Sequence, residues 1–183
     1  MKNKLLYLGL LPILYTNLSC AGAVTTAQKD FLTLVAQCKM AMNNVEQMSN
    51  AVSGWTIPAP SKEQPALRNT YLKTYPDSSI NVQYQTNPAV NLCRVILYTP
   101  QAINLESNIS KDIFPERIHE FSGCEVENGA KIKEAELTPN LFVQYYQAYD
   151  PARKQFISAV EMQKVKSNYF KYYSICEHMD ETS

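Results

Sequence analysis

The side chains that most often perform acid–base or metal chemistry are scarce in this chain. His119 and His178 are its only imidazoles, and the segment that follows His119 lacks the second histidine of a zinc-binding helix. The motifs of nucleophile elbows, phosphate-binding loops and dinucleotide-binding turns do not occur either. We therefore assign no catalytic residue, no metal ligand and no cofactor. A dispersed active site around either histidine, as in a small envelope hydrolase, is the alternative enzymatic hypothesis.

Cysteines are the other residues whose spacing points to chemistry. Four of them, Cys38, Cys93, Cys124 and Cys176, lie beyond the first 23 residues, and no two are close enough to form a CxxC pair. An even number of separated cysteines in an oxidising compartment favours two disulfides, for which three pairings are possible. We favour Cys38–Cys93 and Cys124–Cys176, because each bridge joins neighbouring parts of the chain. Loops of this length give on the order of 4 kcal/mol per bridge in the chain-entropy model.

The N-terminus predicts that the chain is exported. Residues 1–23 begin with Lys2 and Lys4, continue with an apolar stretch over residues 5–15 and end with small side chains at 21–23. This order is that of a secretory signal peptide cleaved after Ala23. The apolar stretch is too short for a helix across the ~30 Å hydrocarbon core of a bilayer. Residues 24–183 then form a single domain.

Cys20 leaves a second processing route open. The segment 17–20 is similar to the site at which bacterial lipoproteins are cut before a lipid-carrying cysteine, although its leucine stands one place late. Cleavage after Ala23 predicts a periplasmic protein, whereas cleavage before Cys20 predicts a lipid-anchored one. A lipid anchor would fit an accessory subunit of an envelope complex.

Charge and composition exclude some classes of partner. The 183 residues include 17 basic and 17 acidic side chains, and removal of the leader leaves 15 against 17. No run of basic residues is present that would neutralise a series of phosphates, which argues against nucleic-acid binding. Hydrophobic residues make up 45% of the chain, enough for a globular core.

Two helices are predicted from periodicity. Apolar residues recur at steps of three and four from Thr26 to Val52, with Cys38 on the apolar stripe and Gly54 as the stop. Three methionines also lie in this helix, where filling of the core is favoured over a binding groove. A second helix is predicted over residues 100–118, and a short helical piece over residues 65–73.

Strands are predicted for most of the remaining chain. Residues 80–85 alternate between apolar and polar side chains, residues 92–99 form a denser apolar run, and Asn87-Pro88 between them indicates a hairpin. Five further strands are expected in a meander, at residues 119–126, 130–137, 141–149, 155–162 and 167–176. A helical interpretation of 141–149 or 155–173 is the rival. The expected fold is α+β, with both helices on one face of a mostly antiparallel sheet.

Tyrosines are the most informative polar aromatic residues, since the chain contains 12 of them. Strand alternation places Tyr145 and Tyr149 on one face and Tyr146 on the other, so that one set belongs to the core. The other set is expected on an exposed aromatic surface suited to a protein or a glycan. The candidate contact residues are Tyr145, Tyr146, Tyr149, Tyr169, Tyr172 and Tyr173.

A weak resemblance supports the same compartment and fold. A cysteine in an N-terminal helix (Cys38), Gly54-Trp55, and a strand cysteine (Cys93) followed by a helix resemble a loose group of small uncharacterised bacterial periplasmic proteins and lipoproteins. The resemblance covers residues 28–175 and brings no activity with it. The leading functional hypothesis is an exported protein that binds another macromolecule, for example as an inhibitor or immunity protein.

Overall fold

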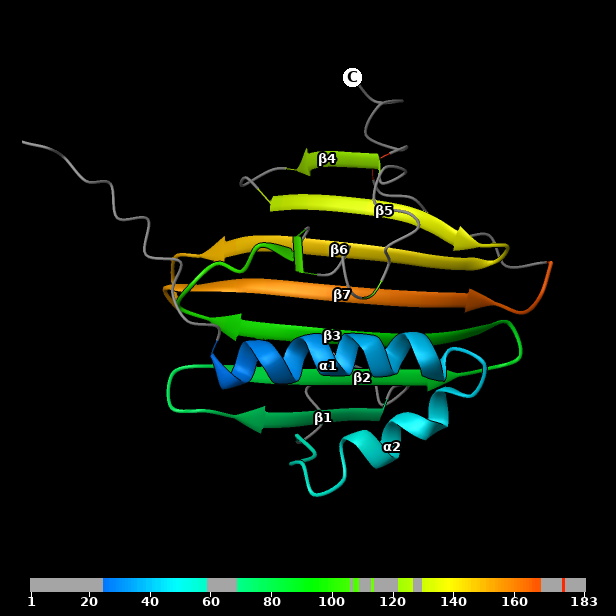
Figure 1. Cartoon of the computed structure of the whole chain (residues 1–183), viewed down its shortest axis with the longest axis horizontal. Coiled ribbons are helices and arrows are strands. Elements are labelled where there is room, and N and C mark those ends of the chain that lie inside the picture. Colours follow the sequence, from blue (N-terminus) through cyan, green and yellow to red (C-terminus); the bar gives the residue numbers. More distant parts are fainter. Residues whose placement is uncertain are drawn as a thin grey trace, which may run out of the picture.

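The fold is α+β and consists of one antiparallel sheet with a helical layer on one face, as seen in a computed structural model (Figure 1). The structure describes residues 25–58, 69–105, 107–108, 113, 130–168 and 176, together with the backbone of 122–126. The seven strands have the order β1-β2-β3-β7-β6-β5-β4. The predicted leader at 1–23, including Cys20, lies outside the described residues.

Two meanders make up the sheet. The first contains β1 (Asn69–Thr74), β2 (Ser79–Thr86) and β3 (Val90–Thr99), and the second contains β4 (Ser122–Val126), β5 (Ala130–Thr138), β6 (Leu141–Asp150) and β7 (Gln155–Val165). After β3 the chain crosses to the opposite edge at β4 and returns strand by strand until β7 pairs with β3. The antiparallel meander was predicted, and the helical interpretation is wrong for 141–149 and for the described part of 155–173.

Turn residues set the hairpins, and the one at Asn87 was expected from the sequence. Asn87 accepts hydrogen bonds from the backbone N–H groups of Ala89 and Val90, each at 2.8 Å, and so closes the β2–β3 turn. Asn140 and Lys154 have positive φ angles of 68° and 54° in the β5–β6 and β6–β7 turns. Asparagine adopts this left-handed conformation more readily than lysine does.

The predicted N-terminal helix is shorter than expected. Helix α1 (Thr26–Ala41) begins with a capping box made by Thr25 and Gln28, and it ends eleven residues before Val52. A 3₁₀ turn η1 (Val45–Gln47) and a short helix α2 (Met48–Ala51) follow it. Asn43 and Asn44 lie at the break, where asparagine side chains compete with helical backbone hydrogen bonds. Burial of the apolar side chains nevertheless continues across the break, which explains why periodicity alone predicted one helix.

Other predicted elements need correction. Residues 69–73, predicted as part of a short helix, belong to strand β1, because pairing with β2 outweighs their local preference. In the predicted strand 167–176, the described residues Ser167, Asn168 and Cys176 adopt bend, turn and helical conformations. Residues 100–104 of the predicted helix 100–118 are bends and irregular backbone, and most of the rest lies outside the described residues, although Ile103, Leu105 and Ile113 are buried.

The core lies between the helical layer and one face of the sheet. In Figure 1, α1 runs in front of β2 and β3. The apolar side of α1 packs on odd-numbered residues of β3 and on even-numbered residues of β2 and β7. The fully buried side chains include Phe31, Val35, Val45, Val52, Ile80, Val82, Val95, Leu97 and Met162.

Candidate functional site

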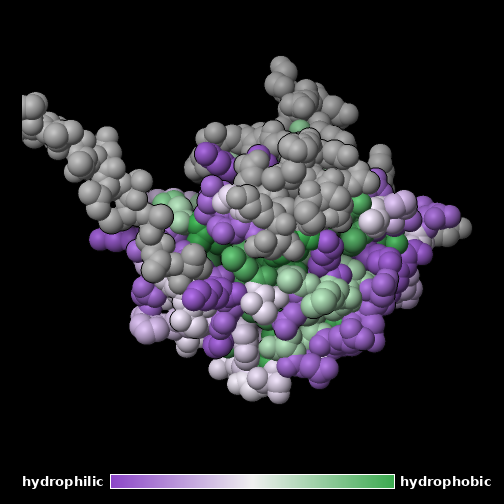
Figure 2. Space-filling model, in the orientation of Figure 1, coloured by the Kyte–Doolittle hydropathy of each residue, from purple (hydrophilic) through white to green (hydrophobic). Residues whose placement is uncertain are grey.

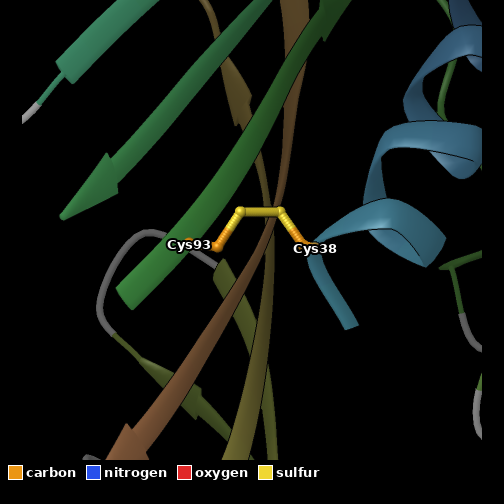
Figure 3. Close-up of a disulfide and its surroundings, with 2 residues drawn as sticks. All are labelled: Cys38 and Cys93. Atoms are coloured by element: carbon orange, nitrogen blue, oxygen red, sulfur yellow. A yellow bond between two sulfur atoms is a disulfide. The ribbon is translucent and has the colours of Figure 1, made fainter. Parts of the chain in front are cut away.

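A disulfide fixes the helical layer to the centre of the sheet. Cys38 of α1 and Cys93 of β3 form this bridge, as predicted, with their Cα atoms 5.8 Å apart (Figure 3). Both cysteines are 0% exposed, so the bridge is part of the core.

The second predicted bridge is only partly described. Cys176 is buried and disulfide-bonded. Cys124 lies in β4 at the register position opposite Ile132, but its side chain lies outside the described residues. The pairing Cys124–Cys176 therefore stays a prediction.

An ion pair ties the other end of α1 to the sheet edge. Asp30 accepts hydrogen bonds from the Lys73 ammonium at 2.8 Å and from the Tyr75 hydroxyl at 2.6 Å. Both hydrogen bonds lower the pKa of Asp30, that from Lys73 more than that from Tyr75. Burial, together with the Asp30 hydrogen bond, raises the pKa of Tyr75. The Lys73 ammonium also lies over the Trp55 ring, 5.6 Å from its centroid, so the segment after α2 joins the same cluster.

The candidate tyrosines do not form one surface. Tyr145 lies in the core and is therefore not a contact residue, whereas Tyr146 is half-buried on the opposite face. Tyr149 shares the face of Tyr145 but lies next to the β6–β7 turn, and it is 50% exposed. The other three candidates, Tyr169, Tyr172 and Tyr173, lie outside the described residues, as do His119 and His178.

Tyr149 belongs to an ordered hairpin tip at the β6–β7 turn. Its ring packs against Phe156 across the hairpin at a centroid distance of 5.0 Å. Asp150 accepts hydrogen bonds from the backbone N–H groups of Ala152 and Arg153, and its carboxylate lies 3.6 Å from the Arg153 guanidinium. That guanidinium in turn lies over the ring of Tyr98, 5.8 Å from its centroid. We call residues 149–156 the hairpin tip.

A further hydrogen bond joins this tip to the neighbouring meander. The Gln155 side chain donates to the backbone carbonyl of Asp77 in the β1–β2 turn at 3.1 Å. The tip also contains Lys154 in its left-handed conformation, for which glycine would be the cheaper residue. A strained backbone that several contacts hold in place is a frequent property of functional segments.

A groove lies beside helix α1, where the sequence favoured filling of the core by methionines over a binding groove. It has a volume of about 310 Å³ and is lined by Gln37, Met40, Ala41, Gln47, Met48, Asn50 and Ala51. Met40 is 73% exposed at its rim, whereas Met48 is 1% exposed in its floor. Figure 2 shows apolar surface in green over the end of α1 that adjoins α2. One signal was available, since Met40 lies off the apolar stripe that contains Cys38.

A row of polar side chains on the opposite face of the sheet was also missed. Cys93 faces α1, so its neighbour Arg94 faces away. The register aligns Arg94 with Glu161 of β7, then with Gln144 of β6 and Glu134 of β5. Arg94 pairs with Glu161, and Gln144 donates to Glu134. Glu161 and Glu134 are only 8% and 3% exposed.

Comparisons with known proteins give no relative whose function could be considered for these surfaces. No protein-family model, curated protein or solved structure matches the chain. Within the described ranges, no three or more potential metal-ligating side chains are grouped closely enough to hold an ion. In the same part of the chain, no helix has the length and apolar character needed to span a bilayer.

Proposed function

We propose that this chain is an exported protein of the bacterial envelope that acts by binding another macromolecule rather than by catalysis. An inhibitor or immunity protein directed against a periplasmic toxin or wall hydrolase is a concrete form of this function. The observation that carries the proposal is the hairpin tip, in which the exposed Tyr149 ring packs on Phe156 and the exposed Arg153 guanidinium lies near Asp150 and over Tyr98. Tyrosine and arginine are the residues that most often dominate the binding energy of protein interfaces.

The contacts within the tip favour tight binding. Ordering a loop or a long side chain at an interface costs about 0.5–1.5 kcal/mol for each immobilised side chain. In this tip the Tyr149 ring already packs on Phe156, and the Arg153 guanidinium already lies between Asp150 and Tyr98. Much of the ordering has therefore occurred before a partner arrives.

The proposed compartment is the periplasm. The leader over residues 1–23 and the buried Cys38–Cys93 bridge support it. We further propose Cys124–Cys176 as a second bridge, since Cys176 is already disulfide-bonded. The mass of the processed N-terminus distinguishes the two anchoring states. A chain that begins at Val24 is free in the periplasm, whereas one that begins at a lipid-modified Cys20 is membrane-anchored.

Affinity capture from the periplasm of the native bacterium tests the binding function. The wild-type chain and an Ile57→Ser control, which changes an exposed side chain outside the tip, should retain the same stoichiometric partner. The double variant Tyr149→Ala/Arg153→Ala should lose it. Recovery of no stoichiometric partner, or equal recovery by the tip variant, contradicts the proposal.

A further inference from the structure

Two tyrosines from neighbouring strands meet on the helical side of the sheet. Tyr71 of β1 and Tyr84 of β2 have ring centroids 5.7 Å apart and ring planes within 5° of parallel. Their hydroxyl oxygens lie 3.3 Å apart and share a hydrogen bond. The register pairs Tyr71 with Val82 and Tyr84 with Asn69, so the two tyrosines are diagonal neighbours on one face, within reach of each other. Two phenols are therefore in contact within one chain.

The two phenols differ in their access to solvent. Tyr84 is 2% exposed and belongs to the core, whereas Tyr71 is half-buried on the edge strand β1. Burial, followed by the Tyr71 hydrogen bond, raises the pKa of Tyr84, so its hydroxyl keeps its proton at neutral pH. An oxidant in solution therefore meets Tyr71 first. The shared hydrogen bond then connects the buried hydroxyl of Tyr84 to the more accessible one.

Contact with a second phenol distinguishes Tyr71 from a more exposed tyrosine. Tyr149 is 50% exposed, but its ring packs on Phe156, which has no hydroxyl group. One-electron oxidation of a phenol gives a radical whose unpaired electron is shared between the oxygen and ring carbons, including those beside the hydroxyl-bearing carbon. Two such radicals combine through these carbons. In the Tyr71–Tyr84 pair the hydroxyl ends of the rings are closer together than the ring centroids.

We propose that Tyr71 and Tyr84 form an oxidative cross-linking site, at which a haem peroxidase acting with hydrogen peroxide joins the two rings as dityrosine. The oxidant takes one electron from Tyr71, whose hydroxyl proton passes to water. Tyr71 then receives a hydrogen atom from Tyr84 through the shared hydrogen bond and is oxidised a second time. The two radicals form one carbon–carbon bond, and the hydrogen on each joined carbon moves to the phenolic oxygen. In total, two electrons and two protons leave the protein and convert one hydrogen peroxide to two water molecules.

The surrounding structure keeps the two rings together during both oxidations. Residues Asn69–Thr74 of β1 pair with β2 along their whole length. Tyr84 is fixed from the core side as well, because its register partner Cys93 is bound to Cys38 of α1. Two reactants held in a fixed geometry react faster than two that must meet by diffusion.

The product would attach the edge strand β1 to β2 by a carbon–carbon bond, which thiols do not reverse. The edge strand would then have a covalent link of its own, in addition to the one that Cys38–Cys93 provides for α1. This proposal is independent of the binding function, because neither Tyr71 nor Tyr84 belongs to the hairpin tip.

Peptide mapping after treatment with a haem peroxidase and hydrogen peroxide tests the cross-link. Dilute protein expressed with its own leader is oxidised, and the monomer is isolated by gel filtration, reduced, alkylated and digested with trypsin. Trypsin separates peptide 69–73, which contains Tyr71, from peptide 74–94, which contains Tyr75 and Tyr84. The wild-type chain should yield the two peptides joined, with a mass two hydrogens below their sum, and the fluorescence of dityrosine.

A matched pair of variants identifies the tyrosine that reacts with Tyr71. Tyr84→Phe should abolish the joined peptide, whereas Tyr75→Phe, which removes the other tyrosine of peptide 74–94, should keep it. Oxidation of the wild-type chain in urea should lower the yield about tenfold, because the unfolded chain no longer holds the two rings together. The thermal midpoint of each variant shows that it is folded.

Three results would overturn the proposal. They are a folded wild-type monomer without the joined peptide, a joined peptide that survives Tyr84→Phe, and a yield that is the same in urea as in the folded chain. The comparison between folded and urea-unfolded wild type needs no substitution, so it decides the question even if Tyr84→Phe does not fold.

Discussion

The two faces of the sheet are stabilised in different ways. The face toward α1 is apolar, contains Val95 and Leu97, and includes the Cys38–Cys93 bridge. The opposite face contains a row of guanidinium, carboxylate and amide groups that bond to one another across the strands. Neighbouring residues of one strand therefore lie in different environments: Arg94 belongs to the polar row, and Val95 packs in the apolar core.

The two faces have different roles: one attaches the helix to the sheet, and the other determines how the strands align. Apolar burial is roughly proportional to area and has no preferred direction, so it attaches the helix without selecting one strand alignment. A paired guanidinium and carboxylate require a particular position, because a slip of two residues would leave a partly buried charge unpaired. We infer that the apolar face supplies most of the stability, while the polar row selects the alignment of β3, β7, β6 and β5.

Removal of the disulfide should have the largest effect on the helical side. The bridge closes a separation of 55 residues, for which the chain-entropy model gives about 4 kcal/mol. The double variant Cys38→Ala/Cys93→Ala should lose a free energy of unfolding of this size in urea titrations. The wild-type chain under identical oxidising conditions is the reference. A loss below about 1 kcal/mol would show that packing alone holds α1 on the sheet.

Truncation of two adjacent residues in β3 compares the two faces directly. Leu97 is completely buried on the helical side, whereas Ile96 is half-buried on the opposite side. Leu97→Ala should cost about 3 kcal/mol, and Ile96→Ala should cost about 1 kcal/mol. Thermal and urea unfolding measure both values. Equal losses would mean that the opposite face is packed as tightly as the core.

The Arg94–Glu161 pair provides a test of the polar row. Glu161→Ala leaves Arg94 partly buried without its carboxylate partner and should cost about 2 kcal/mol, less than for a fully buried pair, since Arg94 is 34% exposed. The double variant Arg94→Met/Glu161→Leu removes both charges and should be more stable than the single variant. Should the double variant prove the less stable of the two, the pair would contribute net stability and not only register.

Local patterns predicted the elements that depend on local chemistry. The hairpins at Asn87, Asn140 and Asp150 were predictable, because Asn87 and Asp150 bind nearby backbone N–H groups and Asn140 adopts the left-handed conformation that its turn requires. The Cys38–Cys93 bridge was predicted because it joins neighbouring parts of the chain, and the structure confirms it. The break after Ala41 was missed because apolar periodicity continues across it, and the strand at Asn69 was missed because its pairing with β2 outweighs its local preference.

The contact surfaces were harder to predict than the elements. Strand alternation places Tyr145 and Tyr149 on the same face, but it does not show which part of that face is covered, and the structure leaves Tyr145 buried and Tyr149 exposed. The polar row depends on the register of four strands, which alternation within one strand does not determine. The groove at Met40 depends on the break between α1 and α2, which the periodicity of the segment concealed.

The smallest effect is expected at Asp30, where the helical layer meets the sheet edge. Its carboxylate is 34% exposed, so Asp30→Asn should cost only about 1 kcal/mol at neutral pH. Because the pKa of Asp30 is lower in the folded chain than its ordinary value of 3.8, the carboxylate stabilises the fold fully above that value. As the pH falls through the folded pKa, this stabilisation is lost, and the difference between wild type and Asp30→Asn should shrink. Urea titrations of both chains at pH 7 and at about pH 3 measure this change. A difference that stays constant, or grows in acid, would show that the Tyr75 and Lys73 contacts do not depend on the charge of Asp30, and that α1 is held at this end by packing alone.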